Sequence, residues 1–226
     1  MKKILYMTLA AIAALSSCSS DDTFPGEGGY NAIAVKDEGS RTNGNLVSSS
    51  QFINGHEYVV LAGTKWATEN VMASGSIKRT DWDDVYGDYF TQENTMHRIG
   101  GGSSAQEAAE SWGSRWKLPT DEQWKKLLAE CDFEWQTEYE HKGHLLVGYL
   151  VKGRGAEAGN SIFLPAAGDS DAHEGLFNVG MSGLYWSADD NHSFYFTTTM
   201  RHIHYVFAHD RELDEGLGLP VRAVAE

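Results

Sequence analysis

Two groups of histidine and acidic residues have spacings that could hold a metal ion. Asp169, Asp171 and His173 alternate in a loop-like stretch and could gather oxygen ligands around a hard cation. His202 and His204 alternate in a strand-like stretch, which places both on one face of that strand. The sequence identifies no accompanying third ligand for the pair, and ordinary exposed polar residues explain both groups. We therefore expect no bound metal and no cofactor.

Motifs for catalysis are incomplete. Gly180-Met181-Ser182-Gly183 is one residue short of the Gly-x-Ser-x-Gly turn of hydrolases. His56-Glu57 and His173-Glu174 both lack the second histidine of a His-Glu-x-x-His zinc motif. Paired acids such as Asp83-Asp84 lie in turn-like stretches, where solvated carboxylates are ordinary. The sequence therefore predicts that the protein is not an enzyme.

Aromatic, histidine and charged residues gather between Asp189 and Arg211, which favours ligand binding there. Such side chains suit sugars, through stacking and hydroxyl pairing, and also protein surfaces. Phe194, Phe196, Ile203 and Phe207 are expected to face the core, by alternation. The residues predicted to contact a ligand are His192, Tyr195, His202, His204 and His209.

The elements that position these residues form an α+β pattern. Thr120-Asp121-Glu122-Gln123 matches a capping box and precedes an apolar stripe of Trp124, Leu127 and Leu128, which predicts a helix. Ser103-Ser104 predicts a second helix, through Trp112, that Gly113 can end. Strands are predicted over 58–61, 65–68, 145–151, 161–164, 184–187, 193–198, 203–207 and 219–224. Two main helices with a run of antiparallel strands make an α+β fold.

Length and charge limit the function further. The chain has 226 residues, 41% of them hydrophobic, which suits one packed domain plus an unstructured piece. It carries 18 Lys and Arg against 32 Asp and Glu, a formal net charge of −14. Because such a surface repels phosphate backbones, no nucleic-acid partner is expected.

The amino terminus predicts a lipid anchor. Lys2-Lys3 precedes an apolar run over 4–15, too short to span a bilayer, and Leu15-Ser16-Ser17-Cys18 follows. This looks like a bacterial lipoprotein signal over 1–17 with a lipidated Cys18; an ordinary secretory signal with an incidental cysteine is the alternative. The polar stretch over 19–50 predicts a flexible tether, so that 18–50 links the membrane to a domain over 51–226.

Six ordered motifs resemble the Fibrobacter succinogenes major paralogous domain family, which is abundant in Bacteroidetes surface lipoproteins. They occupy 65–71, 86–90, 112–124, 160–168, 183–187 and 221–224. The resemblance covers about 51–226 and implies a C-type-lectin-like fold, related to that of the formylglycine-generating enzyme. Many members carry cysteines where this chain has 111–113 and Ala223, and its single domain cysteine, Cys131, predicts no disulfide.

The resemblance also bears on location and function. The acidic start of the tether, Ser19-Ser20-Asp21-Asp22, resembles the surface-export signal of Bacteroidetes lipoproteins and implies the outer membrane, facing outward. No proline stands in a Glu-Pro-Asn or Gln-Pro-Asp triplet, which excludes the usual calcium-dependent sugar motif of lectins. We expect a cell-surface recognition or adhesion module for a glycan or protein ligand. The alternative is a structural or accessory component of a surface assembly without a small ligand.

Replacing Cys18 by Ala should release the protein from the membrane fraction. Two or three acyl chains anchor a protein stably where one is marginal, and acylation starts at this thiol. Immunoblots of fractionated cells measure the outcome, with Ser19→Ala as the matched control. Unchanged membrane association of the Cys18 variant would contradict the predicted anchor.

Overall fold

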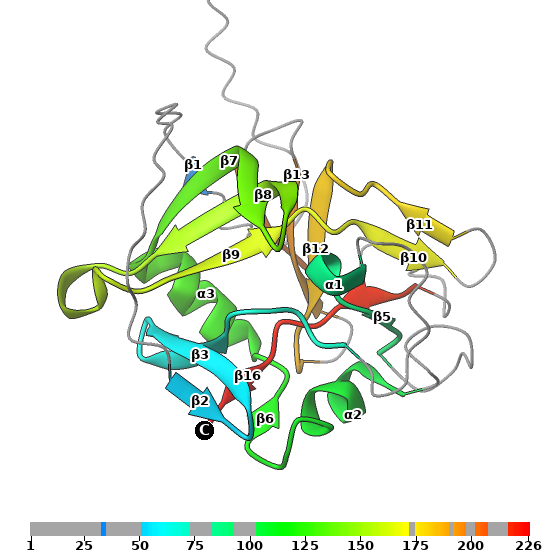
Figure 1. The fold of residues 1–226 in the computed structure, drawn as a ribbon, viewed down its shortest axis with the longest axis horizontal. Helices are drawn as coiled ribbons and strands as arrows, with labels where there is room; N and C mark the ends of the chain where they lie inside the picture. The colour runs from blue at the N-terminus through cyan, green and yellow to red at the C-terminus, as the bar shows by residue number, and fades with distance from the viewer. Residues whose placement is uncertain are drawn as a thin grey trace, which may run out of the picture.

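The computed structural model describes residues 33–34, 51–72, 83–92, 103–171, 175–189, 192–197, 202–207 and 217–226 (Figure 1). For 33–34, 83–84, 171 and 202–207 it describes the backbone alone. The predicted signal, Cys18 and His209 lie outside the described residues, as do most of the tether and His173.

The strands of the first sheet come from both ends of the described chain. Its order is β2 (Gln51–Ile53), β3 (His56–Leu61), β4 (Thr64–Ala67), β16 (Val224–Ala225) and β6 (Trp116–Lys117). Two-residue turns at Asn54-Gly55 and Ala62-Gly63 join the first three strands, and all four residues have positive φ. Such turns match the twist of a hairpin. The backbone N–H groups of Ala62 and Gly63 also donate to the Glu157 carboxylate at 2.7 and 3.1 Å.

A long antiparallel hairpin dominates the second sheet. β7 (Asp132–His141) pairs with β8 (His144–Lys152), and β8 pairs with β9 (Ser161–Pro165). The register of β7 shifts between Gln136 and Tyr139, which marks a bulge. The short 3-10 helix η2 (Gly155–Glu157) lies in the connection between β8 and β9.

A third sheet has the order β1-β14-β13-β12. Its strands are β1 (Ile33–Ala34), β14 (His202–Phe207), β13 (His192–Thr197) and β12 (Ser182–Trp186). β1 belongs to the segment predicted as tether, and it pairs with β14 at the edge of the sheet. Two smaller pairs are β10 (Asp169–Asp171) with β11 (Gly175–Phe177), and β15 (Leu219–Pro220) with β5 (Tyr89–Phe90).

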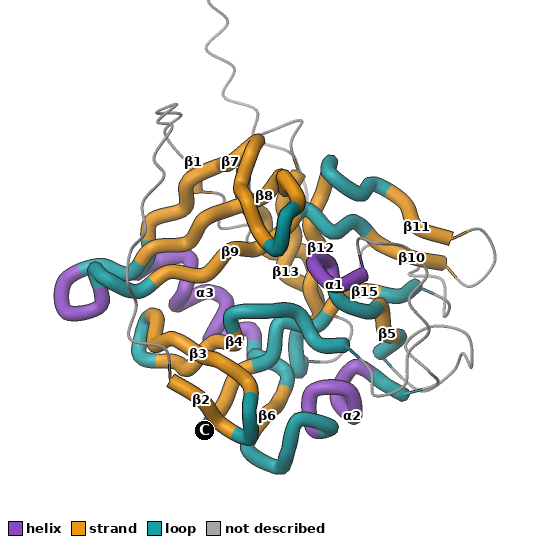
Figure 2. The backbone as a smooth tube through the Cα atoms, viewed as in Figure 1, coloured by secondary structure: helices purple, strands orange, loops and turns teal. Residues whose placement is uncertain are grey.

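Three α-helices complete the described fold, and Figure 2 shows them among the strands. They are α1 (Asp83–Tyr86), α2 (Ala105–Glu110) and α3 (Asp121–Glu130). Thr120 and Gln123 form the predicted capping box of α3, and Ser104 and Glu107 form one at α2. α2 ends before Trp112, because Gly113, at φ 116°, already turns the chain away.

The largest core surrounds α3. Trp124, Leu127 and Leu128 of α3 pack in one cluster with Trp66 of β4 and Phe194 of β13, so the helix contacts two of the sheets directly. Trp124 stacks on Phe194 with ring centroids 4.5 Å apart and planes at 5°. The predicted burial of Trp116, Trp124, Trp186, Phe194 and Phe196 is confirmed.

A buried arginine joins two sheets. Arg222, 1% exposed, precedes β16 and donates from Nη1 to the carbonyl of Ala67 at 3.1 Å and from Nη2 to that of Phe163 at 2.8 Å. Ala67 ends β4 and Phe163 lies in β9, so one guanidinium links the first sheet to the second. Burial lowers the pKa of Arg222, while Tyr185 and Glu69 oppose that shift.

The architecture agrees with the coarse expectation: the described chain is mostly β, with several antiparallel sheets and two main helices. Two details differ. β7 is a full strand outside the predicted strands, although Phe133, Trp135 and Tyr139 alternate with polar residues along it. The predicted strand over 219–224 divides into β15 and β16, because 221–223 leave the ladder where Arg222 turns inward.

The thiol of Cys131 should not react with Ellman's reagent until the protein unfolds. Cys131 is 2% exposed, and burial, the main cause, raises its pKa to about 11. The thiolate is the reactive form, so only about one molecule in a thousand carries it at pH 8. For the chain that begins at Ser19, titration should find no reactive thiol in native protein and one per chain in denaturant. Rapid reaction of the native protein would contradict this burial.

Candidate functional site

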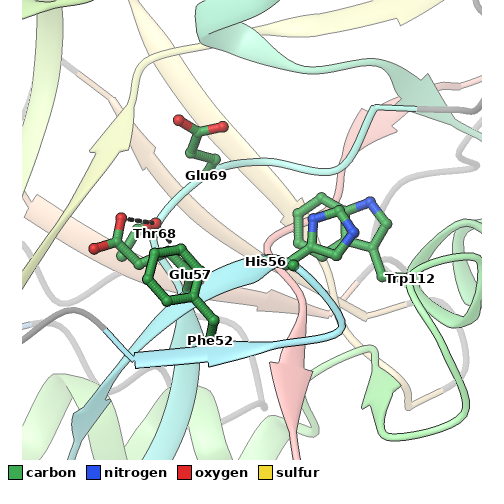
Figure 3. A pocket seen from close by; sticks show the side chains of 7 residues that line it. Phe52, His56, Glu57, Thr68, Glu69 and Trp112 are labelled. Atoms are coloured by element: carbon green, nitrogen blue, oxygen red, sulfur yellow. Dashed lines mark hydrogen bonds between the residues drawn. The ribbon is translucent and has the colours of Figure 1, made fainter.

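A surface hollow of about 210 Å³ lies beside the β2–β3 hairpin (Figure 3). Its lining comes from the hairpin, from the two residues that follow β4, and from the chain that follows α2. The residues are Phe52, Gly55, His56, Glu57, Thr68, Glu69 and Trp112.

The turn of the hairpin is fixed against the chain that follows α2. Asn54 Nδ2 donates to the carbonyl of Trp112 at 3.0 Å. Gly113, next in the chain, approaches Asn54 so closely that a Cβ would collide with Nδ2. Glycine is therefore required at 113 both for the positive φ and for this approach. The contact brings Trp112 and His56 together from distant parts of the sequence.

Aromatic rings form one wall of the hollow. His56 stacks on Trp112, with ring centroids 3.8 Å apart and planes at 6°. Trp116 lies edge-on to both rings and donates from Nε1 to the carbonyl of Ile53 at 3.2 Å. Phe52 is 63% exposed, so its ring is open to a ligand, whereas the half-buried Trp112 packs against a core cluster that includes Ile53 and Trp116.

Two carboxylates also line the hollow: that of Glu57, which pairs with Phe52 in the β2–β3 register, and that of Glu69 (Figure 3). Thr68 Oγ1 donates to Glu57 Oε2 at 3.1 Å, and the backbone N–H of Thr68 donates to the Glu57 carbonyl at 3.1 Å. Glu69 Oε1 lies 2.7 Å from Lys142 Nζ, at the tip of the β7–β8 hairpin. Among the described residues no ion pair involves Glu57, so no described side chain neutralises its charge.

The imidazole of His56 adds little positive charge near neutral pH. Burial lowers the pKa of His56, and the nearby Glu69 only partly opposes this shift. With Glu69 paired to Lys142 and His56 neutral, Glu57 carries the unbalanced charge of the lining. The hollow thus offers an open aromatic face beside acceptors for hydroxyl or ammonium groups.

The structure distributes the ligand residues predicted from sequence over both faces of the third sheet. Tyr195, half-buried, pairs directly with His204 in the register, and Thr197 pairs with His202, so these positions share one face. His192 belongs to the opposite face, with the buried Phe194 and Phe196, because side chains alternate along β13. Ile203 pairs with Phe196 and Tyr205 with Phe194, which matches their predicted core positions.

His192 takes part in a polar cluster at the start of α3. Its Nδ1 lies 2.5 Å from Asp121 Oδ2, and Ser187 Oγ donates to Asp121 Oδ1 at 2.6 Å. Asp189 Oδ2 accepts the backbone N–H of Asp121 at 2.6 Å. Ligand atoms of Asp121, Asp189 and His192 lie within 4.8 Å of one another, close enough to share a cation. Their hydrogen bonds already explain this geometry as a cap on α3.

The first metal candidate is only partly described. Asp169 Oδ1 accepts a hydrogen bond from Asn178 Nδ2 at 2.9 Å. For Asp171 the structure gives the backbone alone, and His173 is not among the described residues. The expectation that Asp169, Asp171 and His173 bind no metal therefore stays a prediction.

Sequence reasoning missed the hollow. No local motif joins Phe52, Glu57 and Trp112, and sixty residues separate the first from the last. His56-Glu57 matches only the first half of a zinc motif. One usable signal was Phe52, a large apolar residue with no apolar residue two positions away on either side.

Comparisons with protein-family models, curated proteins and solved structures find no match to this chain. Among the helices in the described ranges, none combines the length and the apolar character needed to cross a bilayer.

Replacing His56 by Phe should reduce the acid sensitivity of folding. Because the folded pKa of His56 lies below the unfolded value of 6.5, the unfolded chain binds the proton more readily. Neutral His56 therefore contributes stability above pH 6.5. This contribution is lost as the pH falls from 6.5 toward the folded pKa. Phe keeps a ring for the Trp112 stack and removes the proton site. Melting temperatures measured from pH 7 to pH 5 should fall less for His56→Phe than for the original chain; an equal fall would contradict this coupling.

Proposed function

We propose that the protein is a cell-surface-anchored, non-catalytic recognition or adhesion module that holds a glycan or protein ligand in the hollow at the β2–β3 hairpin. The observation that carries the proposal is the open ring of Phe52 beside the carboxylates of Glu57 and Glu69. Aromatic faces with convergent hydrogen-bonding groups are what small ligand sites use for affinity and orientation.

The hollow is held in shape without a ligand. The turn at Asn54-Gly55 is fixed to Trp112, the Thr68 hydroxyl orients Glu57, and Lys142 holds Glu69. Binding to such a surface orders few side chains, which lowers its entropic cost. The volume of about 210 Å³ is below the roughly 300–1,000 Å³ of drug-sized pockets, so a single sugar ring or side chain suits it.

Membership of the Fibrobacter succinogenes major paralogous domain family, with its C-type-lectin-like fold, is part of this proposal. Support comes from the positions of the shared motif residues: Trp116, Trp124, Trp186 and Arg222 are all buried, as residues that specify a fold should be. The hollow lies at the β2–β3 hairpin and the chain after α2, whereas the ligand residues predicted from sequence belong to β13, β14 and the chain around them. The tether of 18–50 and a lipidated Cys18 would present the domain outside the outer membrane.

The second candidate is a structural or accessory component of a surface assembly. It is favoured by apolar side chains that project into solvent on other parts of the domain, Leu145 at 61% and Met181 at 55% exposure. Such residues often mark protein contacts when they gather in a patch. Phe52 adds to this exposed apolar surface, but its carboxylate neighbours favour a polar ligand.

A glycan array probed with the chain that begins at Ser19 tests the proposal. Phe52→Ala should weaken binding to any specific hit by tenfold or more, about 1.4 kcal/mol, while costing less than about 1 kcal/mol of stability because the side chain is exposed. Leu145→Ala, an equally exposed apolar truncation, is the matched control and should leave binding unchanged. Hits that ignore Phe52 would contradict the site. Absence of hits, with a co-purified partner lost in Leu145→Ala, would favour the second candidate.

A further inference from the structure

We infer that the hollow selects a saccharide that bears a free, protonated amine over neutral or acidic saccharides. This inference rests on the proposed function and deepens it by naming the ligand class. Its basis is the combination of an unneutralised carboxylate with an exposed aromatic face inside one small hollow.

Glu57 is the residue that sets the sign of the charge. Its Oε2 accepts from the Thr68 hydroxyl, which orients the carboxylate without neutralising it. Within the described ranges no lysine, arginine or histidine forms an ion pair with Glu57. A ligand ammonium would donate a charge-assisted hydrogen bond here, roughly twice as strong as one from a neutral hydroxyl.

The other charged groups near the hollow do not cancel this preference. Lys142 neutralises Glu69 at 2.7 Å, and His141 Nε2 lies 3.8 Å from the same oxygen. The pKa values of both histidines, His56 and His141, are lowered by burial, so neither supplies a full positive charge near neutral pH. The carboxylate of Glu57 would repel an acidic saccharide, and the chain's net charge of −14 would add to this repulsion.

The exposed ring adds a second attraction for the same ligand. A cation over the face of an aromatic ring gains about 0.5–1 kcal/mol at exposed sites. An amino sugar also has ring C–H groups that can pack on Phe52. A simple ammonium ion has no such ring and gains no such contact. The size of the hollow, about 210 Å³, suits one such ring and argues for a saccharide over an extended basic peptide.

Binding of four matched probes to the chain that begins at Ser19 tests this inference. The probes are a chitosan tetrasaccharide, its fully N-acetylated counterpart, a tetragalacturonate and a tetralysine peptide, measured by calorimetry at about pH 6, where the sugar amine is protonated. We expect the chitosan probe to bind at least tenfold more tightly than the acetylated one, with no binding of the galacturonate. Glu57→Gln should remove that tenfold preference while binding of the acetylated probe persists. Glu130→Gln, an exposed acid of α3 outside the lining, is the control and should change nothing.

The outcomes separate the two proposals. Equal binding of the free and acetylated probes, both lost in Phe52→Ala, would overturn the amine preference and leave the recognition site standing. Binding that survives Phe52→Ala would overturn the site itself. Tetralysine binding as tightly as chitosan would overturn the saccharide assignment and indicate a basic protein segment. A preference that Glu57→Gln preserves would also overturn the role given to Glu57.

Discussion

The buried guanidinium of Arg222 is the constraint on which the rest of the structure depends. A charge that is 1% exposed must be satisfied internally, and it has carbonyls rather than a carboxylate for acceptors. Those carbonyls belong to Ala67 of β4 and Phe163 of β9, so satisfying one residue requires two sheets to meet at a fixed distance. Nε of Arg222 finds no hydrogen-bond partner among the described residues, which leaves this point costly and sensitive to any displacement.

The same constraint reaches the hollow through the backbone. Ala67 N–H donates to the Ala223 carbonyl and Val71 N–H donates to that of Val221, both at 2.9 Å, on either side of Arg222. The segment between Ala67 and Val71 is thereby fixed to the carboxyl-terminal chain at both ends. Thr68 and Glu69, which line the hollow, lie within this segment. The backbone positions of Thr68 and Glu69 are thus a consequence of core packing.

Local signals made part of this structure predictable. The capping box at Thr120 and the stripe of Trp124, Leu127 and Leu128 depend only on near neighbours, and they gave α3 correctly. Alternation likewise placed Phe194 and Phe196 in the core. The hollow could not be predicted in this way, because Phe52 and Trp112 meet only through the fit of Asn54 against Gly113. The role of Arg222 was equally hidden, since a lone arginine in a terminal strand is ordinarily exposed.

The difference between the two glutamates of the hollow follows from the same logic of distant contacts. Glu57 and Glu69 are chemically identical, and sequence alone gives no reason to treat them differently. The β7–β8 hairpin, extended by a bulged ten-residue strand, brings Lys142 to Glu69 but leaves Glu57 with only a hydroxyl. The ammonium group of Lys142 therefore neutralises Glu69, whereas Glu57 keeps its negative charge and accepts only the Thr68 hydroxyl. The length of β7, which carries the hairpin tip and Lys142 to Glu69, therefore decides where a ligand charge is needed.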